Sequence, residues 1–169
     1  MPISPFLKYR AKRVLSALGI RMRPGLPVHP DLGTFCQYLV RQHNFQPGTV
    51  IDVGVADGTI EMYAPFRGAS LLLVEPVAEF EPALKKLCAA YGGEYILAAA
   101  STEAGELPMR VPPDAHAASL CGADTASAEH QRTVRTVRLD AEIAGRELPP
   151  PYLLKADTQG SELDVVGGA

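Results

Sequence analysis

The sequence predicts an α/β fold in which helices cover both faces of a parallel sheet. Two observations indicate this fold. From residue 49 onward, short apolar runs alternate with segments of helical periodicity. The first run also leads into a glycine-containing turn that precedes a helix. The chain has 169 residues, of which 47% are hydrophobic, and this suffices for one domain with a buried core.

Two helices are predicted ahead of the alternating region. Residues 4–18 and residues 32–40 both place apolar side chains at helical spacing. The first 50 residues are basic, with seven Lys or Arg against one acid. Packing on its own domain and binding to a membrane surface or a partner helix remain alternatives for the first helix. We divide the chain into a basic N-terminal helical extension, residues 1–47, and a main domain, residues 48–169.

The elements of the main domain follow in order along the chain. Strands are expected at residues 49–55, 71–75, 95–98, 106–111, 133–139 and 152–156. Helices are expected at residues 60–66, 77–91, 141–146 and 161–166. Residues 99–101 are expected to form a loop, and residues 113–131 look irregular.

Composition and charge exclude several classes of protein. The net charge of −3 gives no general electrostatic reason to bind nucleic acid. No apolar run approaches the roughly 20 residues of a transmembrane helix. The three cysteines lie far apart without a Cys-x-x-Cys pair, which fits a protein of the reducing cytoplasm. The four histidines show no metal-ligand spacing, so no metal is expected.

The turn after the first strand is the most informative motif, and it runs Asp52-Val-Gly54-Val55-Ala56-Asp-Gly58. Its glycines let the backbone turn sharply and approach a ligand. The spacing differs from the Gly-x-Gly-x-x-Gly of dinucleotide folds, and Asp52 would repel a phosphate. An acid here suits a ligand with an ammonium or sulfonium group, as in S-adenosylmethionine. Alternatively, this is an ordinary corner in which Asp52 and Asp57 cap the next helix.

Glu75 ends the second strand 21 positions after Gly54 and is followed by Pro76. Nucleoside-binding α/β folds place the acid that accepts both ribose hydroxyls at this distance. A solvated acid at a strand end is the alternative. Ala100 and Ser101 follow the third strand, so we expect them near the adenine of a bound nucleoside.

Asp157 follows the strand at residues 152–156, which we expect beside the first strand. Ligands of open α/β sheets lie at the carboxyl ends of such strands, so Asp157 is the candidate catalytic residue that orients or deprotonates an acceptor hydroxyl. Alternatively, Asp157 or Ser161 is a helix N-cap, with Ser161-x-x-Asp164 imitating a capping box. His116 is the one histidine to test as a base, and a solvent-facing loop histidine is its alternative.

Five motifs in consistent order over residues 49–169 resemble the FkbM family of S-adenosylmethionine-dependent methyltransferases. They are Asp52-Val-Gly-x-x-x-Gly58, Leu-Val-Glu75-Pro76, Leu139-Asp140, Leu-Lys155-x-Asp157-x-x-Gly160-x-Glu162 and Gly168-Ala169. The resemblance implies a Rossmann-like class I methyltransferase fold and O-methylation of a small-molecule, sugar, glycolipid or polyketide hydroxyl. It also implies that Gly54 and Gly58 approach the methionine part of the cofactor, Glu75 the ribose and Asp157 the reacting end.

The sequence departs from this family at its C-terminal end, because members continue past the Gly-Ala with further strands and helices. We therefore expect a fold truncated after the fourth core strand and its helix, with the strand at residues 152–156 at an open sheet edge. An alternative function follows, namely a non-catalytic cofactor-binding scaffold that forms homo-oligomers through that edge. A nicotinamide-dependent oxidoreductase is disfavoured by the missing Gly-x-Gly-x-x-Gly.

Overall fold

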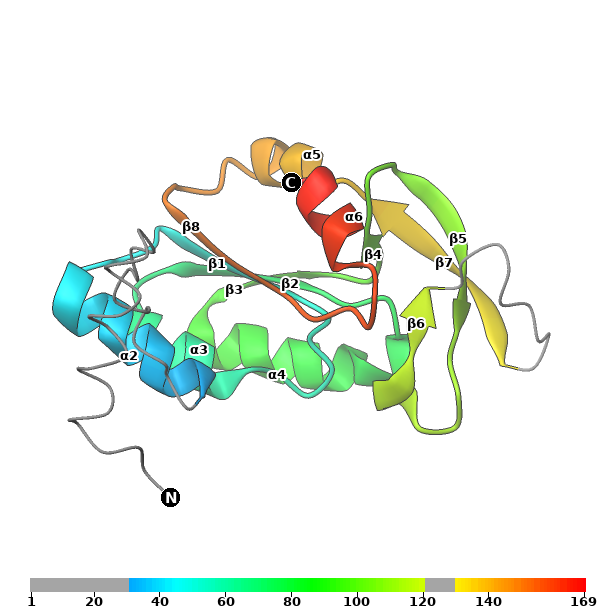
Figure 1. The fold of residues 1–169 in the computed structure, drawn as a ribbon, viewed down its shortest axis with the longest axis horizontal. Coiled ribbons are helices and arrows are strands. Elements are labelled where there is room, and N and C mark those ends of the chain that lie inside the picture. Colours follow the sequence, from blue (N-terminus) through cyan, green and yellow to red (C-terminus); the bar gives the residue numbers. More distant parts are fainter. Residues whose placement is uncertain (1–30, 121–129) are drawn as a thin grey trace, which may run out of the picture.

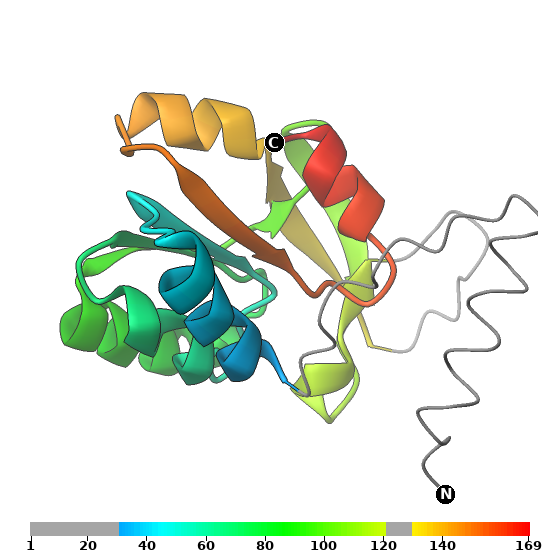
Figure 2. The same cartoon turned by 60° about the vertical axis from the view of Figure 1, so that its left-hand side comes forward.

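A computed structural model of the chain describes residues 31–120 and 130–169. The helix expected at residues 4–18 lies outside these ranges. The described residues form a mixed α/β structure with two sheets, and helices pack on both faces of the first (Figures 1 and 2). This arrangement is consistent with the Rossmann-like methyltransferase fold that the sequence predicts.

The first sheet is parallel and has the strand order β3-β2-β1-β8. Its strands are β1 (Thr49–Val53), β2 (Ser70–Val74), β3 (Gly93–Ile96) and β8 (Tyr152–Ala156). Val53 pairs with Ala156, so β1 and β8 end side by side. The prediction that the strand at residues 152–156 lies next to the first strand is confirmed. The loops that carry Gly54 and Asp157 therefore leave the sheet at the same edge.

Helices cover the two faces of this sheet, as predicted. One face carries α2 (Leu32–His43), α3 (Ile60–Tyr63) and α4 (Glu81–Tyr91), and the other carries α5 (Leu139–Gly145) and α6 (Glu162–Gly167) (Figures 1 and 2). The helix expected at residues 60–66 continues after α3 as a 3-10 turn, and a 3-10 turn also precedes α4. The division of the chain at residue 47 stays a prediction, although Cys36 of α2 lies in the same core cluster as Val50.

The core is built from strands that are buried on both faces. Val50 and Leu71 face the cluster beneath α2, α3 and α4, whereas Ile51 and Leu72 face the cluster beneath α5 and α6. Successive side chains point to opposite faces of a strand. The buried strands β1 and β2 therefore supply both clusters, which is typical of a parallel sheet.

The second sheet is not predicted by the sequence. It has the order β4-β7-β5-β6 and is antiparallel except for the pairing of β4 with β7. Its strands are β4 (Ala99–Ala100), β5 (Gly105–Arg110), β6 (Ser119–Leu120) and β7 (Gln131–Val137). The strands expected at residues 106–111 and 133–139 thus pair with each other, outside the parallel sheet.

Two sequence predictions for residues 93–101 are wrong. The third strand covers residues 93–96 rather than 95–98, because its pairing with β2 begins where Gly93 lies opposite Leu71. Residues 99–100, expected in a loop, form β4, because Ala99 and Ala100 pair with Thr136 and Val137. Part of the irregular segment is also ordered, since a 3-10 turn (Ala115–Ala117) and β6 lie within it.

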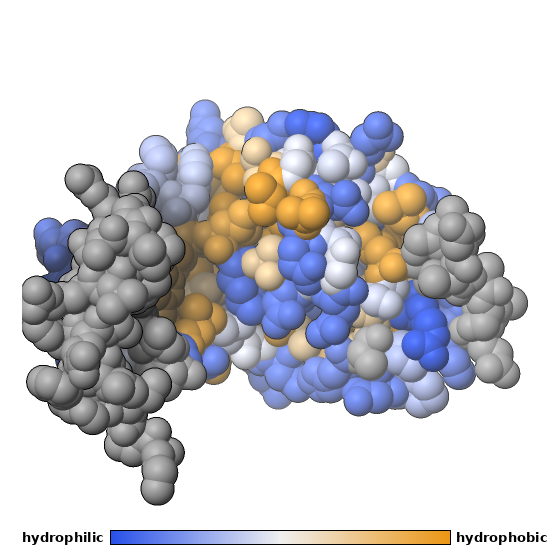
Figure 3. All heavy atoms as spheres, viewed as in Figure 1, coloured by the Kyte–Doolittle hydropathy of each residue, from blue (hydrophilic) through white to orange (hydrophobic). Residues whose placement is uncertain are grey.

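β8 lies at an edge of the parallel sheet, as expected. It pairs with β1 on one side, and among the residues that the structure describes no strand pairs with its other side. Figure 3 shows hydrophobic atoms exposed over the region of β8 and α6. No helix in the described ranges is long and apolar enough to span a membrane.

Candidate active site

A cavity of about 500 Å³ opens at the carboxyl ends of β1, β2 and β8. This volume lies in the range of small-molecule sites. Most of the residues selected from the sequence line it: Gly54, Val55, Ala56, Gly58, Glu75, Pro76, Ala100 and Asp157. Asp52 and Ser101 are buried and lie outside the lining.

The glycine loop takes a conformation that its sequence permits. Gly54 has a φ of 75°, and a Cβ there would lie 2.0 Å from the carbonyl oxygen of Asp157. Gly58 has a φ of 104° and lies against Leu87 of α4. Both positions combine a left-handed backbone with a close neighbour, so a larger residue would be strained there. The loop therefore lies directly between β8 and α4.

Asp52 does not cap the following helix. Its carboxylate is fully buried, accepts a hydrogen bond from the Tyr63 hydroxyl and forms an ion pair with Lys155 Nζ at 2.9 Å. Tyr63 in turn accepts a hydrogen bond from the backbone N–H of Thr59 at 3.0 Å. Burial and the neighbouring Asp52 raise the pKa of Tyr63, so the phenol stays protonated and donates to Asp52. Asp52 thus acts on the site through its neighbours.

Glu75 ties the glycine loop to the end of β2. One carboxylate oxygen accepts the N–H of Ala56 at 3.0 Å, and the other accepts the N–H of Val77 at 2.9 Å. Glu75 is 4% exposed, and burial raises its pKa while the backbone N–H donors oppose that shift. The alternative, a solvated acid at the end of the strand, is therefore wrong. A carboxylate can accept about four hydrogen bonds, so Glu75 keeps some acceptor capacity for a ligand.

The loop after β8 is ordered by Glu162 and leaves Asp157 exposed. The Glu162 carboxylate accepts the backbone N–H groups of Thr158 and Gly160, each at 3.1 Å. Ser161 is the N-cap residue of α6, as one alternative expects, but its hydroxyl donates to the Thr158 carbonyl and forms no capping box with Asp164. The side chain of Asp157 is 63% exposed and lies 3.9 Å from Lys155 Nζ. Its carboxylate is therefore accessible to a ligand.

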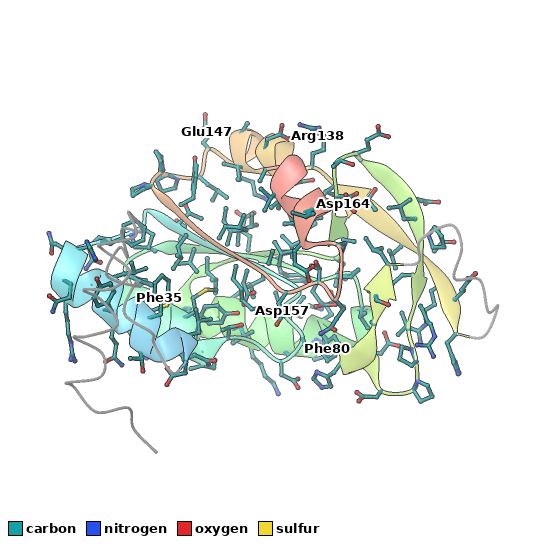
Figure 4. The ribbon with its side chains drawn as sticks, viewed as in Figure 1. Phe35, Phe80, Arg138, Glu147, Asp157 and Asp164 are labelled. Atoms are coloured by element: carbon teal, nitrogen blue, oxygen red, sulfur yellow. The ribbon has the colours of Figure 1, made fainter. Side chains whose placement is uncertain are left out.

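Another wall of the cavity comes from β5, β6 and the turn between them, where the sequence had singled out His116 alone as a residue to test as a base. Met109 of β5, Leu120 of β6 and His116 of the intervening 3-10 turn line the cavity together with Phe80. The His116 ring lies 5.0 Å from that of Phe80, and its Nε2 lies 3.3 Å from Asp57 of the glycine loop. Figure 4 labels Phe80 and Asp157, which lie at the same end of the parallel sheet.

In addition to Asp157, three other carboxylates line the cavity. They are Asp57 in the glycine loop, Glu61 in α3 and Glu75 directly after β2. The lining is therefore acidic, and it suits a ligand with a positive charge better than a phosphate. In the described residues, no group of three His, Cys, Asp or Glu side chains could hold a metal ion.

The cavity lies at the carboxyl ends of parallel strands, where open α/β folds bind their ligands. The fold and the site therefore define an open α/β protein with a crevice at this edge of the sheet. The family model described as "Methyltransferase FkbM domain" matches residues 52–169, and the chain belongs to this family. Comparisons with curated proteins and with solved structures gave no match. Family membership supports methyltransferase activity.

Proposed function

We propose that this protein is an S-adenosylmethionine-dependent methyltransferase that methylates a hydroxyl group of a small molecule, a sugar or a glycolipid. The observation that carries the proposal is the convergence of Gly54, Glu75 and Asp157 on one acidic cavity in a chain of the FkbM family. The cytoplasmic location stays a prediction from the cysteine pattern.

The residues present fit the methyl donor by their chemistry. Glu75 is a buried carboxylate with acceptor capacity left for the ribose hydroxyls. Gly54 and Gly58 bring backbone to the cavity without side chains, where the methionine part would lie. Pro76 and Ala100 line the cavity near Glu75 and offer apolar contact to the adenine. Bound S-adenosylmethionine would supply an electrophilic methyl group on a positively charged sulfur.

Asp157 is the residue that we place next to the acceptor. An acceptor hydroxyl oxygen forms a bond to the methyl carbon while the carbon–sulfur bond breaks and its electron pair stays on sulfur. Asp157 accepts a hydrogen bond from this hydroxyl and takes up its proton. Most of the rate enhancement would come from positioning and from the exclusion of water, because the chemistry is a direct displacement.

Isothermal titration of this chain with S-adenosylmethionine tests the proposal. We expect one site per chain, and Glu75→Ala should weaken the binding at least tenfold because the ribose hydroxyls lose a charged acceptor. Methyl transfer from a radiolabelled donor to a panel of hydroxyl compounds then tests Asp157→Asn, for which we expect a rate about 10²-fold or more below that of the wild type at unchanged donor affinity. A folded chain that binds no donor would contradict the proposal.

A second candidate function is supported by the edge strand β8. An apolar groove of about 440 Å³ runs beside β8 and α5, and Leu163 and Val166 of α6 are 87% and 60% exposed. These features fit a cofactor-binding scaffold that forms homo-oligomers through the edge of the sheet. Light scattering combined with the methyl-transfer assay separates the two functions, because a donor-bound oligomer without product would favour the scaffold.

A further inference from the structure

Lys155 brings an ammonium group into the lining of an acidic cavity. Its side chain is 17% exposed, and it shares the lining with the carboxylates of Asp57, Glu61, Glu75 and Asp157. A cation at this point would repel a ligand that is itself positively charged. The contacts of Lys155 indicate how the protein keeps the ammonium group there.

Two of the three N–H donors of Lys155 are directed at the end of β1. Nζ lies 2.9 Å from Asp52 Oδ1 and 3.0 Å from the carbonyl oxygen of Gly54. The third side of the ammonium group faces Asp157, whose Oδ2 lies 3.9 Å away. Lys155 therefore holds both the first glycine of the loop and the loop after β8 at the mouth of the cavity.

The carboxylate of Asp52, which lies outside the cavity lining, supplies the charge opposite to the Lys155 ammonium group. Asp52 is fully buried, lies directly across from Lys155 in the β1–β8 register and is held by the Tyr63 hydroxyl. The pair carries no net charge, whereas either partner alone would leave a full charge in a region with little water. Since Asp52 lies outside the lining, it does not occupy the space of a ligand.

We propose that Asp52 is a positioning residue that neutralises Lys155, so that Lys155 can hold Gly54 and Asp157 without repelling the sulfonium group of the methyl donor. The pair thereby sets the preference of the cavity for the cationic donor over its neutral product, S-adenosylhomocysteine. This inference rests on the proposed function.

The experiment measures the affinities of S-adenosylmethionine and S-adenosylhomocysteine by isothermal titration and compares their ratio between variants. Asp52→Asn removes the buried partner of the ammonium group and leaves only the more distant, exposed Asp157 beside it, so we expect the preference for the cationic donor to fall about three- to tenfold. Lys155→Met leaves the aspartate charge unbalanced, and we expect the preference to rise by a similar factor. Both ligands are measured on the same preparation, so any loss of folded protein cancels in the ratio.

Two further variants serve as controls. Lys85→Met removes the same charge from an exposed ion pair with Glu81 on α4, outside the cavity, and the ratio should not change. Lys155→Arg keeps the charge and should also leave the ratio near its wild-type value. Tm values, measured by thermal unfolding, report the stability of each variant separately.

The outcomes are distinct. Shifts of the ratio in opposite directions for Asp52→Asn and Lys155→Met support the inference. Parallel losses of affinity for both ligands, with an unchanged ratio, show that the pair is merely structural and overturn it. If Asp52→Asn does not fold, the ratio in Lys155→Met decides alone. A folded wild-type chain that binds neither ligand contradicts the proposed function itself.

Discussion

The backbone N–H of Ala56 donates a hydrogen bond to Glu75 Oε2 over 3.0 Å, and this bond joins the loop after β1 to the end of β2. Ala56 has a φ of 47°, so the loop presents this N–H from a left-handed conformation. Glu75 therefore has two tasks, since the carboxylate that we propose for the ribose also fixes the shape of the glycine loop.

Glu75→Ala should destabilise the protein even without a ligand. The N–H groups of Ala56 and Val77 lose their acceptor, and we expect the free energy of unfolding to fall by about 3 kcal/mol. Urea unfolding measures this difference. Glu79→Ala, which removes an exposed carboxylate paired with Arg132, is the control and should change the free energy of unfolding far less, because exposed ion pairs contribute little. Equal effects of the two substitutions would contradict this assignment.

Glu75 should also make stability depend on pH. Burial raises its pKa in the folded state above the ordinary value of 4.5, so the unfolded chain loses this proton at lower pH than the folded chain. Between the two values the folded state binds more protons, and the free energy of unfolding falls as pH rises. The contribution is fully present below the unfolded pKa and is lost as pH passes the folded one.

Unfolding of the wild type and of Glu75→Gln, measured from about pH 4 upward in steps of about one pH unit, tests this dependence. We expect the stability of the wild type relative to the variant to decrease as the pH rises through the window. Parallel curves for the two proteins would show that Glu75 titrates alike in the folded and unfolded chains.

Gly54→Ala should separate the ends of β1 and β8. The new Cβ would meet the Asp157 carbonyl oxygen at 2.0 Å on a backbone with a φ of 75°. Steric overlap and the left-handed conformation together should cost about 3 kcal/mol or more. Gly145→Ala, at the end of α5 with no atom near its Cβ, should stabilise the protein slightly. A Gly54→Ala protein as stable as Gly145→Ala would refute the geometry of the loop.

The exposed apolar face of α6 gives a test of self-association. Leu163 is 87% exposed, whereas its neighbour Val165 is fully buried. Leu163→Lys should leave the free energy of unfolding within about 0.5 kcal/mol of the wild type, because the side chain has few contacts to lose. If this face lies in a homo-oligomer, the same substitution should lower the molar mass measured by light scattering. An unchanged oligomer would place the interface elsewhere.

The motifs at the ends of β1, β2 and β8 could be predicted from the sequence for a simple reason. The carboxyl ends of parallel strands meet at one edge of a sheet, so Gly54, Glu75 and Asp157 had to converge once each strand was recognised. Hydrophobic periodicity and the glycine turn are local signals, and they sufficed for the parallel sheet and for the helices on its two faces.

The partner of Asp52 and the wall at His116 depended on tertiary structure. Lys155 is 103 residues from Asp52, and the parallel register of β8 on β1 is what makes the two residues neighbours. The wall at His116 exists because β5 pairs with β7 and β6, away from the parallel sheet. Local sequence patterns suffice to show which strands end in chemically useful residues. Only the long-range pairing of strands decided that Asp52 is covered by Lys155 and that β5 and β6 enclose the cavity, because no local pattern encodes strand register.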